Sequence, residues 1–382
     1  MPTLLEPGPD ALAHTRRVAE YIRAEIAAAG GWIDFARYME LALYAPGLGY
    51  YSAGTRKFGG AGDFVTAPEL TPLFGRTLAR LAAPVLAETA GDILELGPGS
   101  GRLALDLLLE LERLGSLPPR YRLLEPSAEL CQRQRALFEH QAPRLLERLE
   151  WLDALPDQIT GLVLGNEVLD ALPVHLVRWG DERWFERGVA TSEDGFIWEE
   201  CPLQDGPLLE AARAINAEPG YLSEIGLAGP ALVATLAERL ERGVLLFLDY
   251  GFPRAEYYHP QRSAGTLMCH YRHHAHDDPF WLPGLNDITA HVDFSAAAEA
   301  GREMGLDLLG YDSQAGFLLG AGLLELLGEL EPGSVEYYRQ AAAVQKLVAP
   351  TEMGELFKVL VMGRGFDSDV NAYRLEARSA RL

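Results

Sequence analysis

The stretch ILELGPGSGRLALDLL, from Ile93 to Leu108, decides how the rest of the chain is interpreted. A short apolar run comes first, three glycines follow within five residues, and an apolar pattern with helical spacing comes last. A strand, a glycine turn and a helix in this order are typical of a nucleotide-type pocket in an α/β protein. Residues elsewhere in the chain must indicate which cofactor the pocket holds.

Apolar segments with short helical stretches between most of them predict a parallel, doubly wound α/β sheet. The expected strands are Ile93–Leu96, Arg122–Leu124, Glu150–Leu152, Leu162–Leu164 and Val244–Asp249, with Leu306–Tyr311 and Phe357–Met362 completing the sheet. The gap after the fourth strand is too long for one crossover. It begins with a hairpin pattern over residues 174–200, so we predict an insertion over about residues 175–243.

Two helices are expected before the sheet, over residues 11–29 and 34–44, the second with Asp34 as its N-cap. A loop rich in glycine and tyrosine follows, and it is longer than a simple connection needs. We expect it to act as a lid, with these candidate residues: Gly62, Asp63, Thr66, Pro68 and Glu69. Residues 1–80 are therefore predicted to form a helical and loop cap, and residues 81–382 the α/β domain.

The composition excludes several classes of partner. The 382 residues carry a formal net charge of −22, which repels nucleic acid and anionic membranes. No apolar stretch approaches the roughly 18 residues of a membrane span, and the N-terminus does not resemble a signal peptide. The cysteines Cys131, Cys201 and Cys269 fit neither a disulfide framework nor a zinc pattern. We expect a soluble chain in a reducing compartment.

The glycine spacing bears on the cofactor. A dinucleotide fingerprint has a third glycine where this chain has Arg102. S-adenosylmethionine has no pyrophosphate, so its loop only needs to bring backbone close to an amino-acid group and a ribose. We predict that Glu95 faces the ammonium group of the cofactor. The loop residues expected to line the site are Gly97, Pro98, Gly99, Ser100 and Gly101.

Acidic residues after the next two strands support the same prediction. Glu125, followed by Pro126, ends the second strand 24 residues after Gly101, where a carboxylate can accept hydrogen bonds from both ribose hydroxyls. Asp153 follows the third strand and is expected to take the adenine amino group. Taken singly, these residues also fit a tight turn, a helix cap and a loop acid. A nicotinamide or flavin cofactor is the alternative.

The chain resembles the MidA family of class I S-adenosylmethionine-dependent methyltransferases over nearly its whole length. The segments that carry the resemblance are Phe35–Tyr51, Phe58–Gly75, ILELGPGSGRLA, Gly165–Val174, Leu248–Phe252, Gly265–Phe294 and Met353–Leu360. The resemblance implies a Rossmann-like methyltransferase sheet with an N-terminal cap and a large insertion after the fourth strand. It also implies a protein arginine methyltransferase whose client is a respiratory complex I subunit or a similar protein during assembly.

The segment GNEVLDALPV, Gly165–Val174, follows the fourth strand, where class I methyltransferases place acceptor residues. Carboxylates suit an arginine acceptor, because they can orient a guanidinium by paired hydrogen bonds. We expect Glu167 and Asp170 to share one face of a short helical turn and bind the guanidinium. Asn166 is expected to bridge cofactor and acceptor. Glu224, in the insertion, is a further catalytic candidate. A helix cap and a solvated acid are the structural alternatives.

The run HYRHHAHDD, from His270 to Asp278, contains four histidines, but methyl transfer needs no metal and we predict none. His273 matches a family position and either lines the acceptor pocket or holds its loop. Asp287 and Asp293 also match family positions, and they either act on substrate or cap and anchor the next helix. Two functions remain as alternatives: a small-molecule methyltransferase, and a cofactor-binding assembly chaperone without catalysis. The expected location is the bacterial cytoplasm, or the mitochondrial matrix in a eukaryote. The oligomeric state is not predicted.

Overall fold

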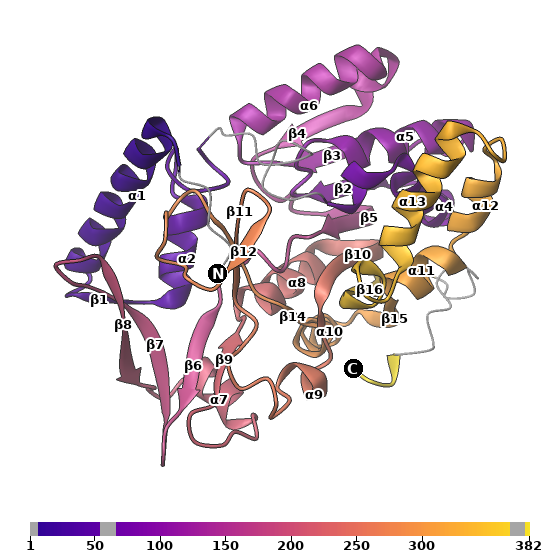
Figure 1. Cartoon of the computed structure of the whole chain (residues 1–382). Helices are drawn as coiled ribbons and strands as arrows, with labels where there is room; N and C mark the ends of the chain where they lie inside the picture. The colour runs from indigo at the N-terminus through magenta and orange to yellow at the C-terminus, as the bar shows by residue number, and fades with distance from the viewer. Residues whose placement is uncertain (1–6, 54–65, 367–378) are drawn as a thin grey trace. The chain divides into compact units, whose positions relative to one another are not determined.

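The computed structural model describes residues 7–53, 66–366 and 379–382, and these fold into two compact units (Figure 1). Unit 1 comprises Met1–Phe64, Asp170–Gly229 and Arg254–Asp293. Unit 2 comprises Val65–Leu169, Pro230–Pro253 and Phe294–Leu382. Each unit has its own hydrophobic core.

Unit 2 contains the central sheet. Its strands run in the order β15-β16-β10-β5-β2-β3-β4. Their bounds are β2 Asp92–Leu96, β3 Tyr121–Leu124, β4 Leu149–Leu152, β5 Ile159–Asn166, β10 Leu240–Phe252, β15 Asp307–Ser313 and β16 Phe357–Arg364. All the strands expected for this sheet are thus present, and the doubly wound α/β fold is confirmed.

The strand order places the glycine turn at the centre of the sheet. Strands β4, β3, β2, β5 and β10 are mutually parallel, with β2 lying between β3 and β5. The chain therefore leaves β2 in one direction and returns to its other side, and in open α/β sheets the carboxyl ends of the strands at such a point hold the ligand. Strand β16 lies between β10 and β15 and is antiparallel to both.

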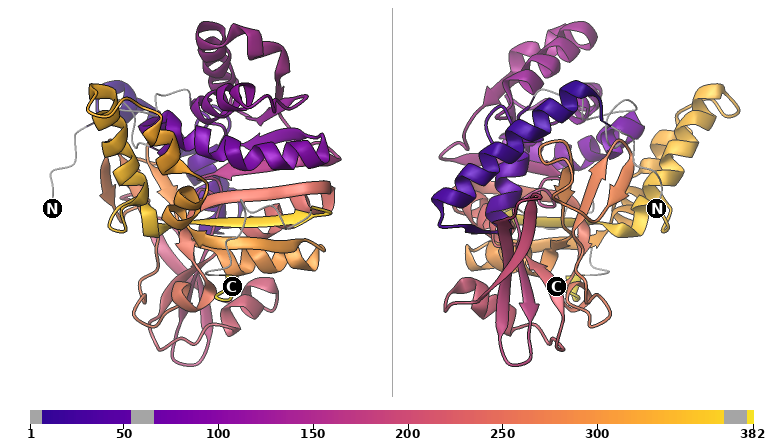
Figure 2. Two further views of the ribbon diagram at one scale, coloured as in Figure 1. Left: turned by 90° about the vertical axis from the view of Figure 1, so that its right-hand side faces the viewer. Right: turned by 60° about the vertical axis from the view of Figure 1, so that its left-hand side comes forward.

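Helices cover both faces of this sheet (Figure 2). On one face the alternate strand residues Leu246 and Val361 join the core formed by α4 and α5. On the other face Met362 packs against Gly301 of α10. The helices are α3 Ala67–Leu70, α4 Pro72–Thr89, α5 Arg102–Arg113, α6 Ala128–Gln141, η1 Pro143–Arg148, α8 Ala228–Arg239, α10 Phe294–Glu303, α11 Gln314–Gly320, α12 Leu323–Gly328, α13 Val335–Val348 and α14 Met353–Leu356.

Unit 1 is built around a second, antiparallel sheet in the order β1-β7-β6-β9, with β8 paired to β7. The predicted hairpin is therefore extended by a third strand. A smaller sheet has the order β12-β11-β13. The elements are α1 Pro9–Ala28, β1 Trp32–Asp34, α2 Phe35–Tyr44, β6 His175–Trp179, β7 Trp184–Thr191, β8 Phe196–Pro202, α7 Pro207–Arg213, β9 Leu222–Ile225, α9 Arg254–Tyr257, β11 Met268–Tyr271, β12 His274–His276, β13 Asp287–Thr289 and β14 Val292–Asp293.

Both predicted N-terminal helices are confirmed as α1 and α2, and the Asp34 carboxylate accepts a hydrogen bond from the backbone N–H of Arg37 at 2.7 Å. The compact units differ from the predicted ranges 1–80 and 175–243. Helix α4 packs on α5 and so belongs to unit 2, and β10 begins at Leu240 within the central sheet. A second segment, 254–293, also belongs to unit 1 because β11 and β13 lie in it.

Glycines allow the central strands to approach closely at their amino ends. Gly161 of β5 and Gly243 of β10 pair in register and have φ angles of +120° and +137°. A Cβ on Gly243 would lie 1.9 Å from the Gly161 carbonyl oxygen, and one on Gly161 would lie 2.1 Å from that of Asp92. No side chain fits between these backbones, so strands β2, β5 and β10 depend on glycine here.

We expect Gly243→Ala to lower the free energy of unfolding by about 3 kcal/mol, because the added methyl group meets rigid backbone in a conformation that disfavours alanine. Urea unfolding followed by circular dichroism measures this. Gly229→Ala in α8 is the matched control, since an added Cβ has no atom within 4 Å there. Equal unfolding midpoints for the two variants would contradict the close approach of β5 and β10.

Candidate functional site

The loop between β2 and α5 has the backbone geometry that its glycines predict. Gly97, Gly99 and Gly101 all have positive φ angles, of 56°, 53° and 81°. The Gly101 N–H donates to the Pro98 carbonyl at 2.8 Å, and Gly101 is the N-cap of α5. The Ser100 hydroxyl hydrogen-bonds the carboxylate of Glu69, on α3. This loop therefore presents backbone groups at the carboxyl end of β2.

Glu95 lies within β2 and is buried, 3% exposed. Its carboxylate accepts a hydrogen bond from the Tyr121 hydroxyl at 2.7 Å. Burial raises the pKa of Glu95 to about 7, the Tyr121 hydrogen bond opposes the shift, and the nearby Glu125 carboxylate adds to it. No basic side chain in the described part of the chain forms an ion pair with Glu95. An ammonium group on a ligand fits a buried acid of this kind.

Glu125 and Asp153 follow β3 and β4 at the same edge of the sheet. Glu125 is buried, and its carboxylate accepts a hydrogen bond from the Ser127 N–H at 2.9 Å. Its own N–H donates to the Leu152 carbonyl at 3.1 Å, which ties the ends of β3 and β4 together. Pro126 and Asp153 are exposed. Their roles toward ribose and adenine stay predictions.

The end of β5 forms a sharp bend rather than the expected helical turn. Glu167 has a φ angle of +54°, in the left-handed region that glycine favours. The Asp249 carboxylate of β10 accepts hydrogen bonds from the Val168 and Leu169 N–H groups at 3.1 and 2.8 Å. The Glu167 N–H donates to the Leu248 carbonyl at 2.9 Å. These three backbone hydrogen bonds hold the bend against its conformational cost of about 1–2 kcal/mol.

Asn166, the last residue of β5, lies beside this bend. Its side-chain NH₂ donates to the Glu167 carboxylate at 3.1 Å. Its Oδ1 atom is buried and accepts no hydrogen bond from any residue that the structure describes. A buried acceptor without a donor destabilises a folded protein, and a ligand with a hydrogen-bond donor would satisfy it.

Asp170 belongs to unit 1 and is 5% exposed there. Its carbonyl accepts a hydrogen bond from the Ala290 N–H at 3.0 Å. Tyr51 donates a hydrogen bond to the Asp287 carboxylate at 2.7 Å and stacks on Tyr44. Burial, together with the Asp170 and Asp287 carboxylates, raises the pKa of both tyrosines. Asp170 and Asp287 therefore share one buried, tyrosine-rich neighbourhood within unit 1.

Glu224 of β9 is also buried in unit 1, 1% exposed. Its carboxylate accepts hydrogen bonds from the Thr266 and Leu267 N–H groups, each at 2.9 Å, and from the Thr266 hydroxyl at 3.1 Å. A Cβ on Gly265 would lie 2.2 Å from this carboxylate. These contacts give Glu224 a structural role in fixing residues 264–267, whether or not it also acts on an acceptor.

The histidines of residues 270–276 do not converge on one point. His274 and His276 alternate along β12, His270 pairs with Ala275 on β11, and His273 lies in the turn with a φ angle of +65°. Cross-strand partners share a face of the sheet, so His270 faces away from His274 and His276.

A different set, Asp34, His175 and Glu186, brings its ligand atoms within 4.8 Å of one another. His175 pairs with Glu186 at 2.6 Å, and this hydrogen bond outweighs burial and raises the His175 pKa. Asp34 serves as the N-cap of α2. We interpret the set as an ion pair beside a helix cap.

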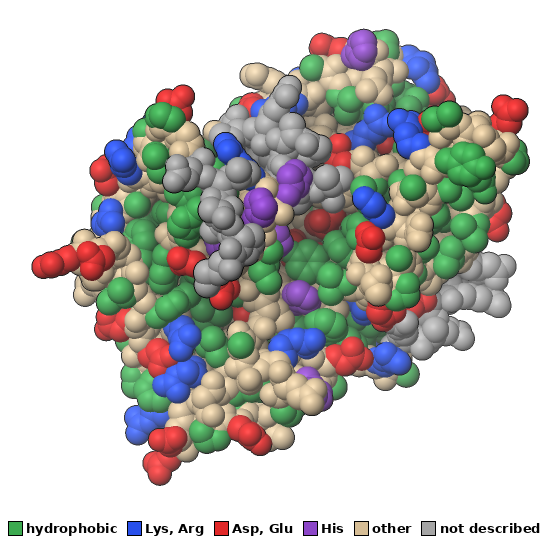
Figure 3. All heavy atoms as spheres, viewed as in Figure 1, with side chains coloured by type: hydrophobic (Ala, Val, Ile, Leu, Met, Phe, Trp, Pro, Cys, Tyr) green, Lys and Arg blue, Asp and Glu red, His purple; other side chains and the backbone are tan. Residues whose placement is uncertain are grey.

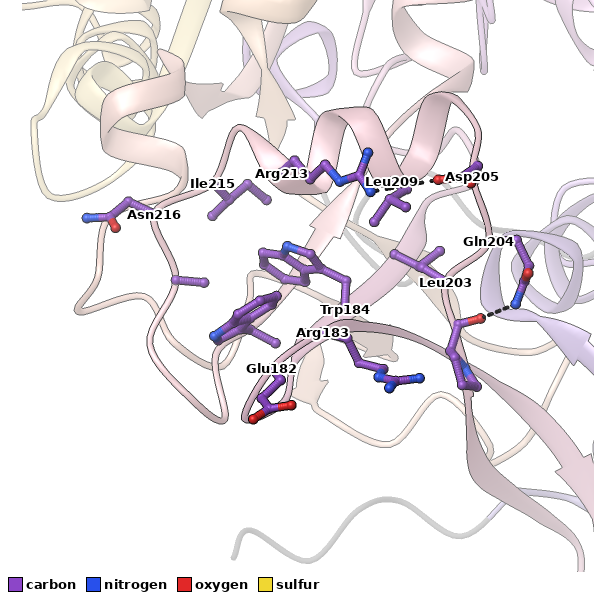
Figure 4. Close-up of a pocket in the computed structure, with 13 residues that line it drawn as sticks. Glu182, Arg183, Trp184, Leu203, Gln204, Asp205, Leu209, Arg213, Ile215 and Asn216 are labelled. Atoms are coloured by element: carbon purple, nitrogen blue, oxygen red, sulfur yellow. Dashed lines mark hydrogen bonds and ion pairs between the residues drawn. The ribbon is translucent and has the colours of Figure 1, made fainter.

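A cavity of about 700 Å³ lies elsewhere in unit 1 (Figure 4). Its lining includes Trp179 and Trp184, whose ring centroids are 5.2 Å apart, and the side chain of Arg213. None of the predicted cofactor or acceptor residues lines it. Figure 3 shows acidic side chains (Asp and Glu) and basic side chains (Lys and Arg) interspersed over the described part of the face that it presents.

Glu69, Gln134 and Asp249 lie in the site of unit 2, although the sequence did not predict these roles for them. Glu69 was expected only in a lid, of which Gly62 and Asp63 lie outside the described residues. Gln134 contacts the glycine loop from α6, and Asp249 supports the Glu167 bend. Asp249 had a signal, since it ends an apolar strand run beside the predicted crevice. For Gln134, the helical pattern of its segment gave no signal of a role in the site.

Comparison with known proteins identifies the chemistry. Residues 75–312 match a family model described as "Putative S-adenosyl-L-methionine-dependent methyltransferase". A Drosophila melanogaster relative, "Protein arginine methyltransferase NDUFAF7 homolog, mitochondrial", is 30% identical and is aligned over 91% of this chain and 85% of its own length. The human protein arginine methyltransferase NDUFAF7 is 28% identical over 87% of this chain and 80% of its length.

A crystal structure from Burkholderia thailandensis, bound to S-adenosyl-homocysteine, is similar over the full length of both chains. It has 50% sequence identity and a TM-score of 0.96. This likeness and the family match show that the cofactor is S-adenosylmethionine.

Among the described residues, no helix is both long enough and apolar enough to cross a membrane.

The Glu95 pKa generates a prediction about cofactor affinity. Below pH 7 the free protein holds Glu95 protonated, so binding of the ligand ammonium must release that proton. We expect the affinity for S-adenosyl-homocysteine to fall up to about tenfold per pH unit below 7 and to level off above it. Titration calorimetry in two buffers of different ionisation enthalpy measures both the affinity and the released proton.

Two variants serve as controls for this measurement. Glu95→Gln should bind more weakly with a flat pH profile, whereas Glu139→Gln, at an exposed position of α6, should match the wild type. The same raised pKa also affects stability: the free energy of unfolding of the unliganded protein should fall as pH rises from about 4.5 through about 7. Ligand affinity should rise over the same range, so the two effects have opposite signs. A wild-type affinity independent of pH between 5.5 and 7 would contradict the Glu95 assignment.

Proposed function

We propose that this chain, which belongs to the family of S-adenosyl-L-methionine-dependent methyltransferases, transfers the methyl group to an arginine side chain of a protein. Support for the arginine acceptor comes from relatives named protein arginine methyltransferases, which align over most of this chain. The structural observation that favours it most is the Glu167 bend, where a carboxylate-bearing residue occupies a backbone conformation that glycine would adopt at lower cost.

The residues at the edge of the central sheet fit the cofactor. The loop Gly97–Gly101 offers backbone groups, and Glu95 offers a buried carboxylate for the ammonium group. We propose that Glu125 accepts hydrogen bonds from the ribose hydroxyls, and that Asn166 Oδ1, which no described residue satisfies, accepts one from the cofactor. When bound, S-adenosylmethionine supplies a methyl group on a sulfonium, whose transfer is an in-line displacement that needs alignment more than acid–base help.

The acceptor side requires carboxylates because a guanidinium is always charged and its lone pairs are delocalised. We propose that Glu167 receives two guanidinium N–H groups, which orients the arginine and concentrates its positive charge away from the attacking nitrogen. The attacking nitrogen gains a methyl group and loses one proton, and the Glu167 carboxylate is the proposed acceptor of that proton. Asp170 and Glu224 remain further proposed acceptor residues, and Asn166 the proposed bridge to the cofactor.

The proposed client is a subunit of respiratory complex I, as the family resemblance implies. Strand β8 of unit 1 is exposed or half-buried along its length, and we propose it as surface for a protein acceptor. Curated relatives carry the word mitochondrial in their names, and the similar solved structure is bacterial. We propose the bacterial cytoplasm as the setting, or the mitochondrial matrix for a eukaryotic source.

Mass spectrometry of arginine methylation in cells with and without this protein tests the function. We expect a methylated arginine on a complex I subunit that is lost on deletion and restored by the wild-type protein but not by Glu167→Gln. An unchanged methylation map would refute the complex I client. Incubation of the purified protein with labelled cofactor then distinguishes transfer to other peptides, transfer to small metabolites, and client binding without transfer.

We expect Glu167→Gln to reduce the transfer rate at least about 100-fold while the Kd for S-adenosyl-homocysteine stays within twofold of wild type. The amide keeps the shape and the Asn166 contact but loses the charge that the guanidinium needs. Single-turnover transfer to a peptide acceptor and titration calorimetry measure the two quantities. Glu241→Gln, at an exposed position of β10, is the control. Wild-type transfer by Glu167→Gln would exclude Glu167 from catalysis.

A further inference from the structure

Gln134 is a buried polar residue in the middle of α6, with 0% of its surface exposed. Its side-chain NH₂ donates to the Gly99 carbonyl at 2.8 Å and lies 3.4 Å from the Glu125 carboxylate. Its Oε1 atom accepts a hydrogen bond from the Trp151 indole N–H at 2.8 Å. One amide thus contacts the glycine loop, the end of β3 and the end of β4.

These three partners allow only one orientation of the amide. An indole N–H can only donate, so it requires Oε1. A backbone carbonyl and a carboxylate can only accept, so they require the NH₂ group. Reversing the amide would place like groups against each other at all three contacts. Gln134 is therefore held in a single rotamer and a single flip state by partners from three separate segments.

The fit between Gln134 and the glycine loop is also close sterically. A Cβ on Gly101 would lie 3.0 Å from Gln134 Cγ, so the absence of a side chain at Gly101 leaves the room that Gln134 occupies. On the opposite side, Trp151 is fixed a second time, because the Arg135 guanidinium lies 3.9 Å from its ring centroid. Neither end of the Gln134 amide can shift without moving the loop or the indole.

We propose that Gln134 is a positioning residue for the cofactor, which sets the distance between the Gly97–Gly101 loop and the Glu125 carboxylate. In the binding mode proposed above, on which this inference rests, the loop approaches one end of S-adenosylmethionine and Glu125 approaches the ribose. A rigid amide between them therefore matches the site to the length of the adenosyl group. Without it, the loop carbonyl and the carboxylate lose their common partner and move independently. This inference concerns the cofactor alone and does not depend on an arginine acceptor.

The first test is the affinity for S-adenosyl-homocysteine, measured by titration calorimetry on the full chain. Gln134→Met keeps the length of the side chain and removes its hydrogen bonds, and we expect the Kd to rise about tenfold. Gln132→Met, two residues earlier at an exposed position of α6, is the matched control and should bind as the wild type does. A Kd within twofold of wild type for a folded Gln134→Met protein would overturn the proposal.

A double-mutant cycle distinguishes positioning from a general contribution to stability. If Gln134 acts through Glu125, the rise in Kd caused by Gln134→Met should be at least threefold smaller in a Glu125→Gln background. A residue that only supports the fold would weaken binding by the same factor in both backgrounds, and that result would overturn the proposal. The melting temperature of each variant, measured without ligand, separates lost stability from lost affinity.

Gln134→Glu provides a second route if the methionine variant does not fold. A protonated glutamic acid can still donate to the Gly99 carbonyl, whereas the ionised form places a negative charge beside Glu125 and loses that donor. We expect its affinity, taken relative to wild type at each pH, to improve at least threefold between pH 8 and pH 6. A ratio that is constant with pH would show that the donor at this position does not govern binding, and would overturn the proposal.

Discussion

Parallel strands end at one edge of a sheet, and this constraint determines where the proposed cofactor residues of unit 2 lie. Because β2 has β3 on one side and β5 on the other, the segments that follow these three strands start at neighbouring points of one edge. Glu95, Glu125 and Asn166 come from different parts of the sequence, yet the register of the ladder places them at neighbouring strand ends. The glycines at the opposite ends of β5 and β10 contribute to the same result, since they allow the strands to align without intervening side chains.

The carboxylates at this edge show how environment divides similar side chains among different tasks. The Asp249 carboxylate accepts hydrogen bonds from two backbone N–H groups of the bend after β5, which gives it a structural role. Glu95 has a single tyrosine hydroxyl as its hydrogen-bond donor among the described residues and a pKa raised to about 7. Burial is the main cause of the raised Glu95 pKa, and the Tyr121 hydrogen bond only partly opposes it. A carboxylate left short of donors in a buried crevice is ready for a cationic ligand.

Apolar periodicity and glycine spacing were sufficient to predict the strands of the central sheet and its glycine loop, because both signals are local. The contacts that hold the loop and the bend were not predictable in this way. The sequence does not distinguish Gln134 from the other polar residues of its helix, and only the fold brings it into contact with Gly99 and Trp151. Glu167 was expected on a helical turn, and this prediction was wrong. The bend depends on Asp249, 82 residues later, and the sequence around Glu167 does not reveal that contact. Long-range contacts of polar groups with backbone are invisible to pattern analysis.

The position of β16 has a consequence for how the chain is made. Among the described residues it follows every other strand of the central sheet in the sequence, yet it lies between β10 and β15 and pairs with both. Unit 1 is interleaved in a similar way, since Trp32–Asp34 pairs with residues 188–190. A ribosome must therefore synthesise the chain as far as Arg364 before these strands can all pair. Until β16 emerges, the apolar edges of β10 and β15 have no partner strand, and the nascent chain carries an aggregation hazard that a simpler strand order would avoid.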